Sequence, residues 1–279
     1  MSLVYAGFVS HAPGITGRAD LVENTDMRDA LYAALEKQKE EIRSSDAQAL
    51  IVVAAEHFAN FFMNNMPAFC IGVGDKHYGP IEDPNWLKIP KTEIPGAPEL
   101  ALKLVTEVMH KVDVAYAEEW KCDHGIMVPL HFLTPEYDLP IIPVNINCQG
   151  PPLPPLARTW ALGEALRHAC DQVDEKVALI GTGGISHWPA TPDSGKINEA
   201  WDREFLDRLC RYSKGELLAY TDEETYRDGG QGGFEIRTFI AAAAAAQAEA
   251  EVQFYTAQIP LFSVGCTVGR FKLNTSRSA

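Results

Sequence analysis

The sequence is poor in positive charge and contains no pair of closely spaced cysteines. Lysine and arginine number 24 against 38 aspartates and glutamates, so the formal net charge is −14 at pH 7. Nucleic acids and anionic membrane surfaces repel such an acidic chain, and we expect neither as a partner. The six cysteines lie at least 22 residues apart, which excludes the C-x-x-C spacing of zinc ribbons and thiol redox sites.

Long apolar runs and a secretion signal are also missing. No stretch reaches the roughly 18 uncharged apolar residues that a membrane-spanning helix needs. The segment 1–14 has neither the basic start nor the apolar core of a signal peptide. The sequence therefore predicts a cytoplasmic protein without a membrane partner.

The length and composition are those of an ordinary globular enzyme. The chain has 279 residues, of which 46% are hydrophobic and 22% are charged. A chain of this length buries about three-quarters of the surface that its unfolded form exposes. Its core needs no disulfide or structural metal, so a metal site, if there is one, is expected to be catalytic. We expect residues 1–279 to form a single catalytic domain.

Apolar runs and amphipathic stretches alternate along the chain. The runs, which predict strands covered on both faces, are 3–9, 49–55, 69–74, 114–120, 139–146, 177–183 and 259–268. The stretches with helical spacing are 27–43, 98–111, 156–171, 199–213 and 235–252. This alternation predicts an α/β fold with a largely parallel central sheet flanked by helices.

Four of the eight histidines follow the end of a predicted strand within a few residues: His11, His57, His124 and His187. Ligands of parallel α/β sheets bind beyond the carboxyl ends of the strands. A structural role is the better interpretation of any one of these histidines alone, since histidine is often partly buried. Four at equivalent positions instead indicate one shared site.

A metal site of this kind also needs a carboxylate. Two histidines and one carboxylate on one face leave open coordination positions, as in non-haem Fe(II) oxygenases. Glu235 begins the helix predicted at 235–252, although an acidic residue in a first helical turn is common for electrostatic reasons alone. Glu56 and Asp123 adjoin His57 and His124 in sequence, and are candidates to orient the imidazole rings.

Six motifs in order resemble one enzyme family. They are SHAPG (10–14), EHFANFF (56–62), MPAFCIGVG (66–74), DHG (123–125), GTGGISH (181–187) and FEIRTF (234–239). Together they resemble the class III extradiol ring-cleavage dioxygenases, which include the catalytic β subunit of protocatechuate 4,5-dioxygenase and the 2,3-dihydroxyphenylpropionate 1,2-dioxygenases. Each motif alone is weak, but the set extends over nearly the whole chain.

The resemblance implies a role for each of the five residues. His11, His57 and Glu235 match the ligands of a ferrous ion, whereas His124 and His187 match an acid/base pair. We assign the base to His187, because an imidazole suits proton abstraction near neutral pH, and the acid to His124. The implied substrates are a catechol-type aromatic diol and O₂. The resemblance also implies a homo-oligomer, and a small partner subunit is possible by analogy with the protocatechuate enzymes.

Two other functions stay open from the residues alone. A His₂Glu site also suits Zn²⁺ and a hydrolase, although the H-E-x-x-H spacing of zinc proteases is absent. A binding protein that has lost turnover is the other alternative, but it has no need of both proton-transfer histidines.

An anionic catechol would require a local lysine or arginine, because the net charge of −14 attracts no anion. The aromatic residues near the site fit either a substrate wall or core packing: Phe58, Phe61, Phe62 and Trp188.

Overall fold

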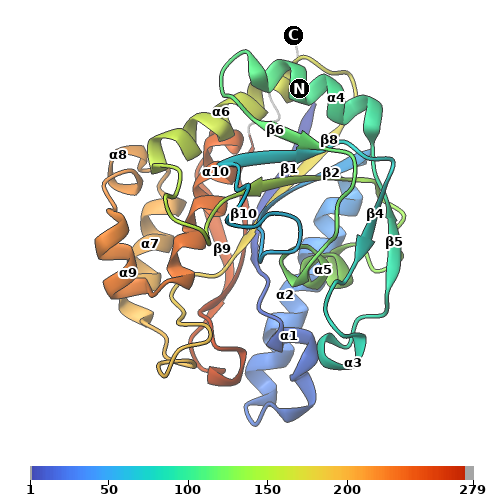
Figure 1. The fold of residues 1–279 in the computed structure, drawn as a ribbon. Helices are drawn as coiled ribbons and strands as arrows, with labels where there is room; N and C mark the ends of the chain where they lie inside the picture. Colours follow the sequence, from blue (N-terminus) through green and yellow to red (C-terminus); the bar gives the residue numbers. More distant parts are fainter. Residues whose placement is uncertain (1, 274–279) are drawn as a thin grey trace.

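The computed structural model describes residues 2–273, which form one α/β domain built on an eight-stranded sheet (Figure 1). The strand order is β6-β3-β7-β2-β8-β1-β10-β9. The strands are β1 (Leu3–Ser10), β2 (Ala49–Ala55), β3 (Phe69–Gly72), β6 (Ala115–Ala117), β7 (Ile141–Ile146), β8 (Val177–Gly183), β9 (Ala250–Thr256) and β10 (Cys266–Phe271). A separate antiparallel pair contains β4 (Lys76–Gly79) and β5 (Thr92–Pro95).

The central strands β7, β2, β8 and β1 are parallel and end level with one another. Thr182 near the end of β8 pairs with Val9 of β1 on one side and with Ala54 of β2 on the other. Ala55 in turn pairs with Ile146, the last residue of β7. The loops after these four strands therefore meet at one edge, where α/β sheets bind their ligands.

Helices cover both faces of this sheet. The helices longer than one turn are α2 (Thr25–Ser44), α4 (Pro98–Met109), α5 (His124–Leu133), α6 (Leu156–Asp171), α7 (Glu199–Cys210), α9 (Asp222–Gly229) and α10 (Ile236–Ala246). The short ones are α1 (Gly14–Gly17), α3 (Pro84–Leu87), α8 (Lys214–Leu217), and the 3₁₀ turns η1 (Ala19–Leu21), η2 (Gly232–Glu235) and η3 (Pro260–Phe262). None of the helices within residues 2–273 is long and apolar enough to cross a membrane.

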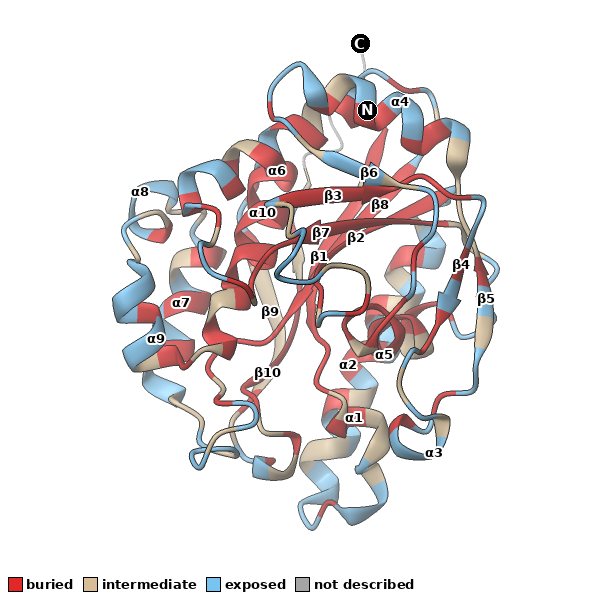
Figure 2. Ribbon diagram, in the orientation of Figure 1, coloured by how far each residue is buried: buried red, intermediate tan, exposed pale blue. Residues whose placement is uncertain are grey.

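The sheet separates two hydrophobic cores. Figure 2 shows the central strands between them as buried. Along β2, Ile51 and Val53 pack with α4, α6 and α10, whereas Leu50 and Val52 pack with α2 and α5. Every residue of β2 is buried. This two-sided burial explains why the strands appear in the sequence as continuous apolar runs rather than as an alternating pattern.

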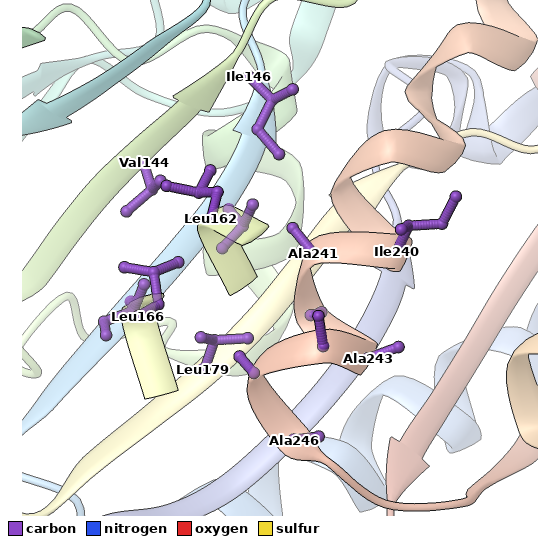
Figure 3. Packing of buried hydrophobic residues seen from close by; sticks show 14 of the residues in the cluster. Val144, Ile146, Leu162, Leu166, Leu179, Ile240, Ala241, Ala243 and Ala246 are labelled. Atoms are coloured by element: carbon purple, nitrogen blue, oxygen red, sulfur yellow. The ribbon is translucent and has the colours of Figure 1, made fainter. Parts of the chain in front are cut away.

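The alanine-rich helix α10 packs closely against α6 and β8, and Figure 3 shows its small side chains beside leucines of these two elements. A Cβ atom placed on Gly163 of α6 would collide with the carbonyl oxygen of Ala241. A Cβ on Gly181 of β8 would lie 2.7 Å from the carbonyl oxygen of Thr238. Small residues on all three elements therefore allow α10 to approach β8, and this sets the position of Glu235 immediately before the helix.

The prediction was wrong at the C-terminal end of the chain. The helix expected at 235–252 ends at Ala246, and Gln247 caps it in a left-handed conformation with φ of 53°. Residues 250–256 instead form β9, because pairing with β10 outweighs the helical preference of alanine and glutamate. The strand expected at 259–268 begins at Cys266, since residues 260–262 form the turn η3.

Candidate active site

A cavity of about 470 Å³ opens at the carboxyl edge of the four central strands, and all five predicted residues line it. We call His11, His57, His124, His187 and Glu235 the polar cluster. Glu235 belongs to η2, whereas His11, His57 and His187 follow β1, β2 and β8, respectively. The predicted convergence of these residues is thus present in the structure.

The carboxylate of Glu235 joins two of the histidines. Its Oε2 atom lies 3.1 Å from Nε2 of His11, and its Oε1 atom lies 3.2 Å from Nε2 of His57. The side chain of Glu235 is only 1% exposed. Two further donors hold it, because the backbone N–H of Gly184 and the Gln149 side chain both donate to its oxygens. The carboxylate is therefore fixed before any ligand arrives.

Separate hydrogen bonds orient the rings of His11 and His57. Nδ1 of His11 lies 2.7 Å from the hydroxyl of Thr182, which itself donates to the carbonyl oxygen of Gly125. Nδ1 of His57 lies 3.0 Å from Oδ2 of Asp123. These partners accept the Nδ1 protons, so Nε2 of each ring is the atom that faces Glu235.

Glu82 holds His124 in the same way. Its Oε1 atom lies 2.7 Å from Nδ1 of His124 and also accepts the backbone N–H of that residue at 2.9 Å. The ring of His124 lies 4.0 Å from that of His57, measured between centroids. Sequence reasoning missed Glu82, which lies 42 positions from its partner in a loop without any periodic signal.

His187 lies in a glycine-lined space. Its Nδ1 atom lies 3.1 Å from the carbonyl oxygen of Ile185, which can only accept, so the neutral ring carries its proton on Nδ1. Its Nε2 atom lies 3.8 Å from Oε1 of Glu235 and is left to accept a proton. A Cβ on Gly232 would collide with this ring, so the glycine is required there.

The surroundings divide the cluster into charged and neutral groups. Burial alone would lower the pKa of His57, but the carboxylates of Asp123 and Glu235 outweigh it and raise that pKa well above its usual value. Burial would raise the pKa of Glu235, but His11 and His187 hold it well below the usual range. Burial lowers the pKa values of His124 and His187, so both rings are neutral near pH 7.

Neither carboxylate that was predicted to orient an imidazole ring contacts the ring of the histidine beside it in sequence. Asp123 orients His57 rather than its sequence neighbour His124, and it also caps the N-terminus of α5. Glu56 instead accepts backbone N–H groups of Phe58, Asn60 and Phe61 and so fixes the loop after β2. Adjacent residues in extended chain point to opposite sides, which explains both changes of partner.

His124 enters the cluster by another route than the predicted one. The strand expected at 114–120 is only β6, which pairs parallel with β3, and β3 runs antiparallel to β7. The carboxyl end of β6 therefore points away from the cluster edge. The chain then turns back, and His124 is presented as the first residue of α5.

The four aromatic residues near the predicted site do not line the cavity. Phe58 and Phe62 are 40% and 52% exposed, Phe61 packs against Trp120, and Trp188 is buried. The cavity is lined instead by other residues, which include Trp86, Leu261, Phe262, Gln149 and Arg18.

The donor atoms of the cluster fit a divalent transition metal. Potential ligand atoms of His11, His57 and His124 all lie within 4.8 Å of one another. Imidazole nitrogens together with a carboxylate suit iron, zinc and related ions. The ionised Glu235 supplies the negative charge that such an ion requires, and a bound cation would displace the Nε2 proton of His57 and take the freed lone pair.

Comparison with known proteins gives consistent results. A protein of Cupriavidus necator named 2,3-dihydroxyphenylpropionate/2,3-dihydroxicinnamic acid 1,2-dioxygenase is 29% identical over 310 residues, which cover 93% of this chain and 92% of the relative. A protein of Photorhabdus laumondii with the same name is 30% identical over 252 residues, covering 74% and 77% of the two chains.

A solved structure shares the fold. The crystal structure of an uncharacterized protein from Escherichia coli K12 matches with a TM-score of 0.53 at 17% identity, covering 85% of this chain and 91% of the other. Residues 5–266 match the family described as the catalytic LigB subunit of aromatic ring-opening dioxygenase. The chain therefore belongs to this family of metal-dependent enzymes, and the extradiol ring-cleaving dioxygenase class that its sequence predicts is confirmed.

Proposed function

We propose that the chain holds Fe(II) through His11, His57 and Glu235 and uses O₂ to open the ring of a catechol-type substrate. The observation that carries this proposal is the carboxylate of Glu235, whose two oxygens each contact Nε2 of a different histidine. This is the two-histidine, one-carboxylate arrangement typical of non-haem Fe(II) oxygenases. The ferrous ion would supply coordination of the diol and activation of O₂.

His187 is the proposed catalytic base. Its neutral ring has a free Nε2 atom, because Nδ1 donates to Ile185, and it lines the cavity beside Glu235. An imidazole that is neutral near pH 7 can take a hydroxyl proton from the bound diol at Nε2. The nearby carboxylate of Glu235 stabilises the resulting imidazolium.

His124 is the proposed catalytic acid. Glu82 accepts its Nδ1 proton, so a proton taken at Nε2 from the second hydroxyl of the bound diol would give an imidazolium that a carboxylate stabilises. From Nε2 the proton can return to the reacting oxygen in the cavity. His124 also lies within 4.8 Å of the potential ligand atoms of His11 and His57. Metal analysis of H124A therefore tests the assignment, because an acid can be removed without loss of the metal, whereas a ligand cannot.

The relatives suggest the kind of substrate. Their names specify 2,3-dihydroxyphenylpropionate, a catechol with a carboxylate-bearing side chain. A cavity of about 470 Å³ lies within the usual range of small-molecule sites, about 300–1,000 Å³. We propose a small aromatic diol as the substrate and the cytoplasm as the compartment. Self-association and a small partner subunit stay predictions, which light scattering on the purified protein tests.

The deciding experiment measures O₂ uptake after anaerobic loading with Fe(II). The panel contains protocatechuate, gallate, 2,3-dihydroxyphenylpropionate, aminophenol and unsubstituted catechol. We expect one O₂ consumed per substrate and a ring-fission product that absorbs visible light. A sample loaded with Zn²⁺ serves as the control, because a His₂Glu site also suits zinc. Absence of uptake with every substrate despite bound iron would contradict the proposal.

A further inference from the structure

One cationic side chain other than histidine lines the cavity. Among the described lining residues, Arg18 is the single lysine or arginine. It is exposed to solvent between α1 and η1, whereas Glu235 is buried. Arg18 therefore lies at the opening of the cavity, and the polar cluster lies at the inner end. Figure 1 shows α1 beyond the ends of the central strands.

Arg18 has no acidic partner within residues 2–273. Every other described arginine except Arg158 has a carboxylate oxygen within ion-pair distance. The guanidinium of Arg18 makes one long hydrogen bond, in which Nη1 donates to the carbonyl oxygen of Leu261 at 3.5 Å. A guanidinium has five N–H donors, so most of them are left for a ligand.

Apolar residues line the cavity alongside these two charged regions. They include Pro13, Trp86, Phe262 and Val264. The backbone of Trp86 lies against α1. The carbonyl oxygen of Trp86 is so close to Gly17 that a Cβ atom on Gly17 would collide with it. A ligand that fits this lining has an aromatic diol at the polar cluster, an apolar spacer and an anionic group at the opening.

We propose that Arg18 binds a carboxylate on the side chain of the catechol substrate and sets the preference for anionic over neutral catechols. This inference rests on the proposed function and specifies its substrate class. A planar guanidinium is suited to bind a carboxylate through two parallel hydrogen bonds. Because Arg18 is exposed, solvent and salt screen the interaction, and we expect it to change affinity by about fivefold.

The test compares R18Q with R158Q on two substrates. Arg158 is the other described arginine without an acidic partner and is exposed on α6. Both variants replace an arginine by glutamine, so they change the net charge equally. The substrates are 2,3-dihydroxyphenylpropionate and 3-propylcatechol, which differ by the carboxylate. We expect R18Q to lower kcat/KM for the acid about fivefold, mainly through KM, and to leave kcat/KM for 3-propylcatechol unchanged. R158Q should change neither.

Equal losses on both substrates, or no loss on the acid, would overturn the assignment of Arg18. Raising the salt concentration should lower kcat/KM of the wild type for the acid more than kcat/KM of R18Q, because salt screens the ion pair. If the wild type turns over neither substrate, the proposed function fails separately. In that case, calorimetry measures the affinity of the metal-free protein for 2,3-dihydroxyphenylpropionate in the absence of O₂. This affinity then decides the role of Arg18. Equal affinity of R18Q and R158Q, or no binding to the wild type, would contradict it.

Discussion

The two ends of the cavity differ in how firmly their side chains are held. At the inner end, His11 and Glu235 are 4% and 1% exposed, and each has a hydrogen-bond partner beyond its contact with the other. At the opening, Trp86 is 47% exposed, and the guanidinium of Arg18 makes one long hydrogen bond to the part of the chain that the structure describes. The inner end is attached to buried strands and α10, whereas the opening is formed by one-turn helices.

This difference separates chemistry from selectivity. Residues that transfer protons or hold a metal need fixed geometry, and buried elements provide it. Residues that recognise the variable part of a substrate tolerate exposed, short segments. We therefore expect substitutions at the inner end to affect every substrate, and those at the opening to affect only some.

The largest expected effect is that of E235Q. The variant keeps the shape of the side chain but removes the charge that the metal requires, so we expect loss of bound iron and loss of activity well beyond about a hundredfold. Metal content and O₂ uptake measure the two losses. E249Q is the matched control, because Glu249 is exposed on the surface. Normal iron content in E235Q would contradict the ligand assignment.

Removal of either histidine that we propose as a proton-transfer group should have a different signature. We expect H187A and H124A to retain iron but to lower kcat by about a hundredfold to ten-thousandfold, the usual contribution of general acid or base catalysis. Iron analysis beside steady-state kinetics tests both predictions. Loss of iron in H124A would instead make His124 a ligand.

The two carboxylates that orient histidines provide a sharper comparison. Asp123 accepts from Nδ1 of His57, and Glu82 accepts from Nδ1 of His124. We expect D123N to weaken iron binding about 10- to 100-fold, since it disturbs a proposed ligand. E82Q should lower kcat and leave iron binding unchanged. Iron titrations of the two variants distinguish them, and equal weakening in both would show that His57 and His124 share one role.

The sequence predicted the inner end much better than the opening. Continuous apolar runs identify the buried strands, and the residues after them include His11, His57 and His187 by the topology of a parallel sheet. Arg18 at the opening follows from no such rule, and neither does Glu82, which holds His124 at the inner end. Both lie in short turns whose positions depend on tertiary contacts. His124 was found for an incorrect reason, since α5 presents it rather than the end of a central strand.

The packing of α10 supports the inner end and can be tested separately. We expect G163A to lower the free energy of unfolding by about 1–3 kcal/mol, because its methyl group would push against the carbonyl oxygen of Ala241. Urea denaturation measures this change. G215A is the control, because no atom lies within 4 Å of a Cβ at Gly215, and its effect should stay within about 1 kcal/mol. Equal stability of the two variants would contradict the close packing.

The smallest effect concerns a buried carboxyl group that holds the loop before His187. Asp202 is fully buried, accepts the backbone N–H of Ser186 and the hydroxyl of Tyr255, and burial raises its pKa to about 6. Between its ordinary pKa and this value the folded state binds more protons than the unfolded state, so stability falls as pH rises. From pH 5 to 7 we expect the free energy of unfolding of the wild type to fall by about 1 kcal/mol relative to that of D202N. Urea denaturation at both pH values measures it, and a constant difference between the two proteins would show that Asp202 is charged throughout.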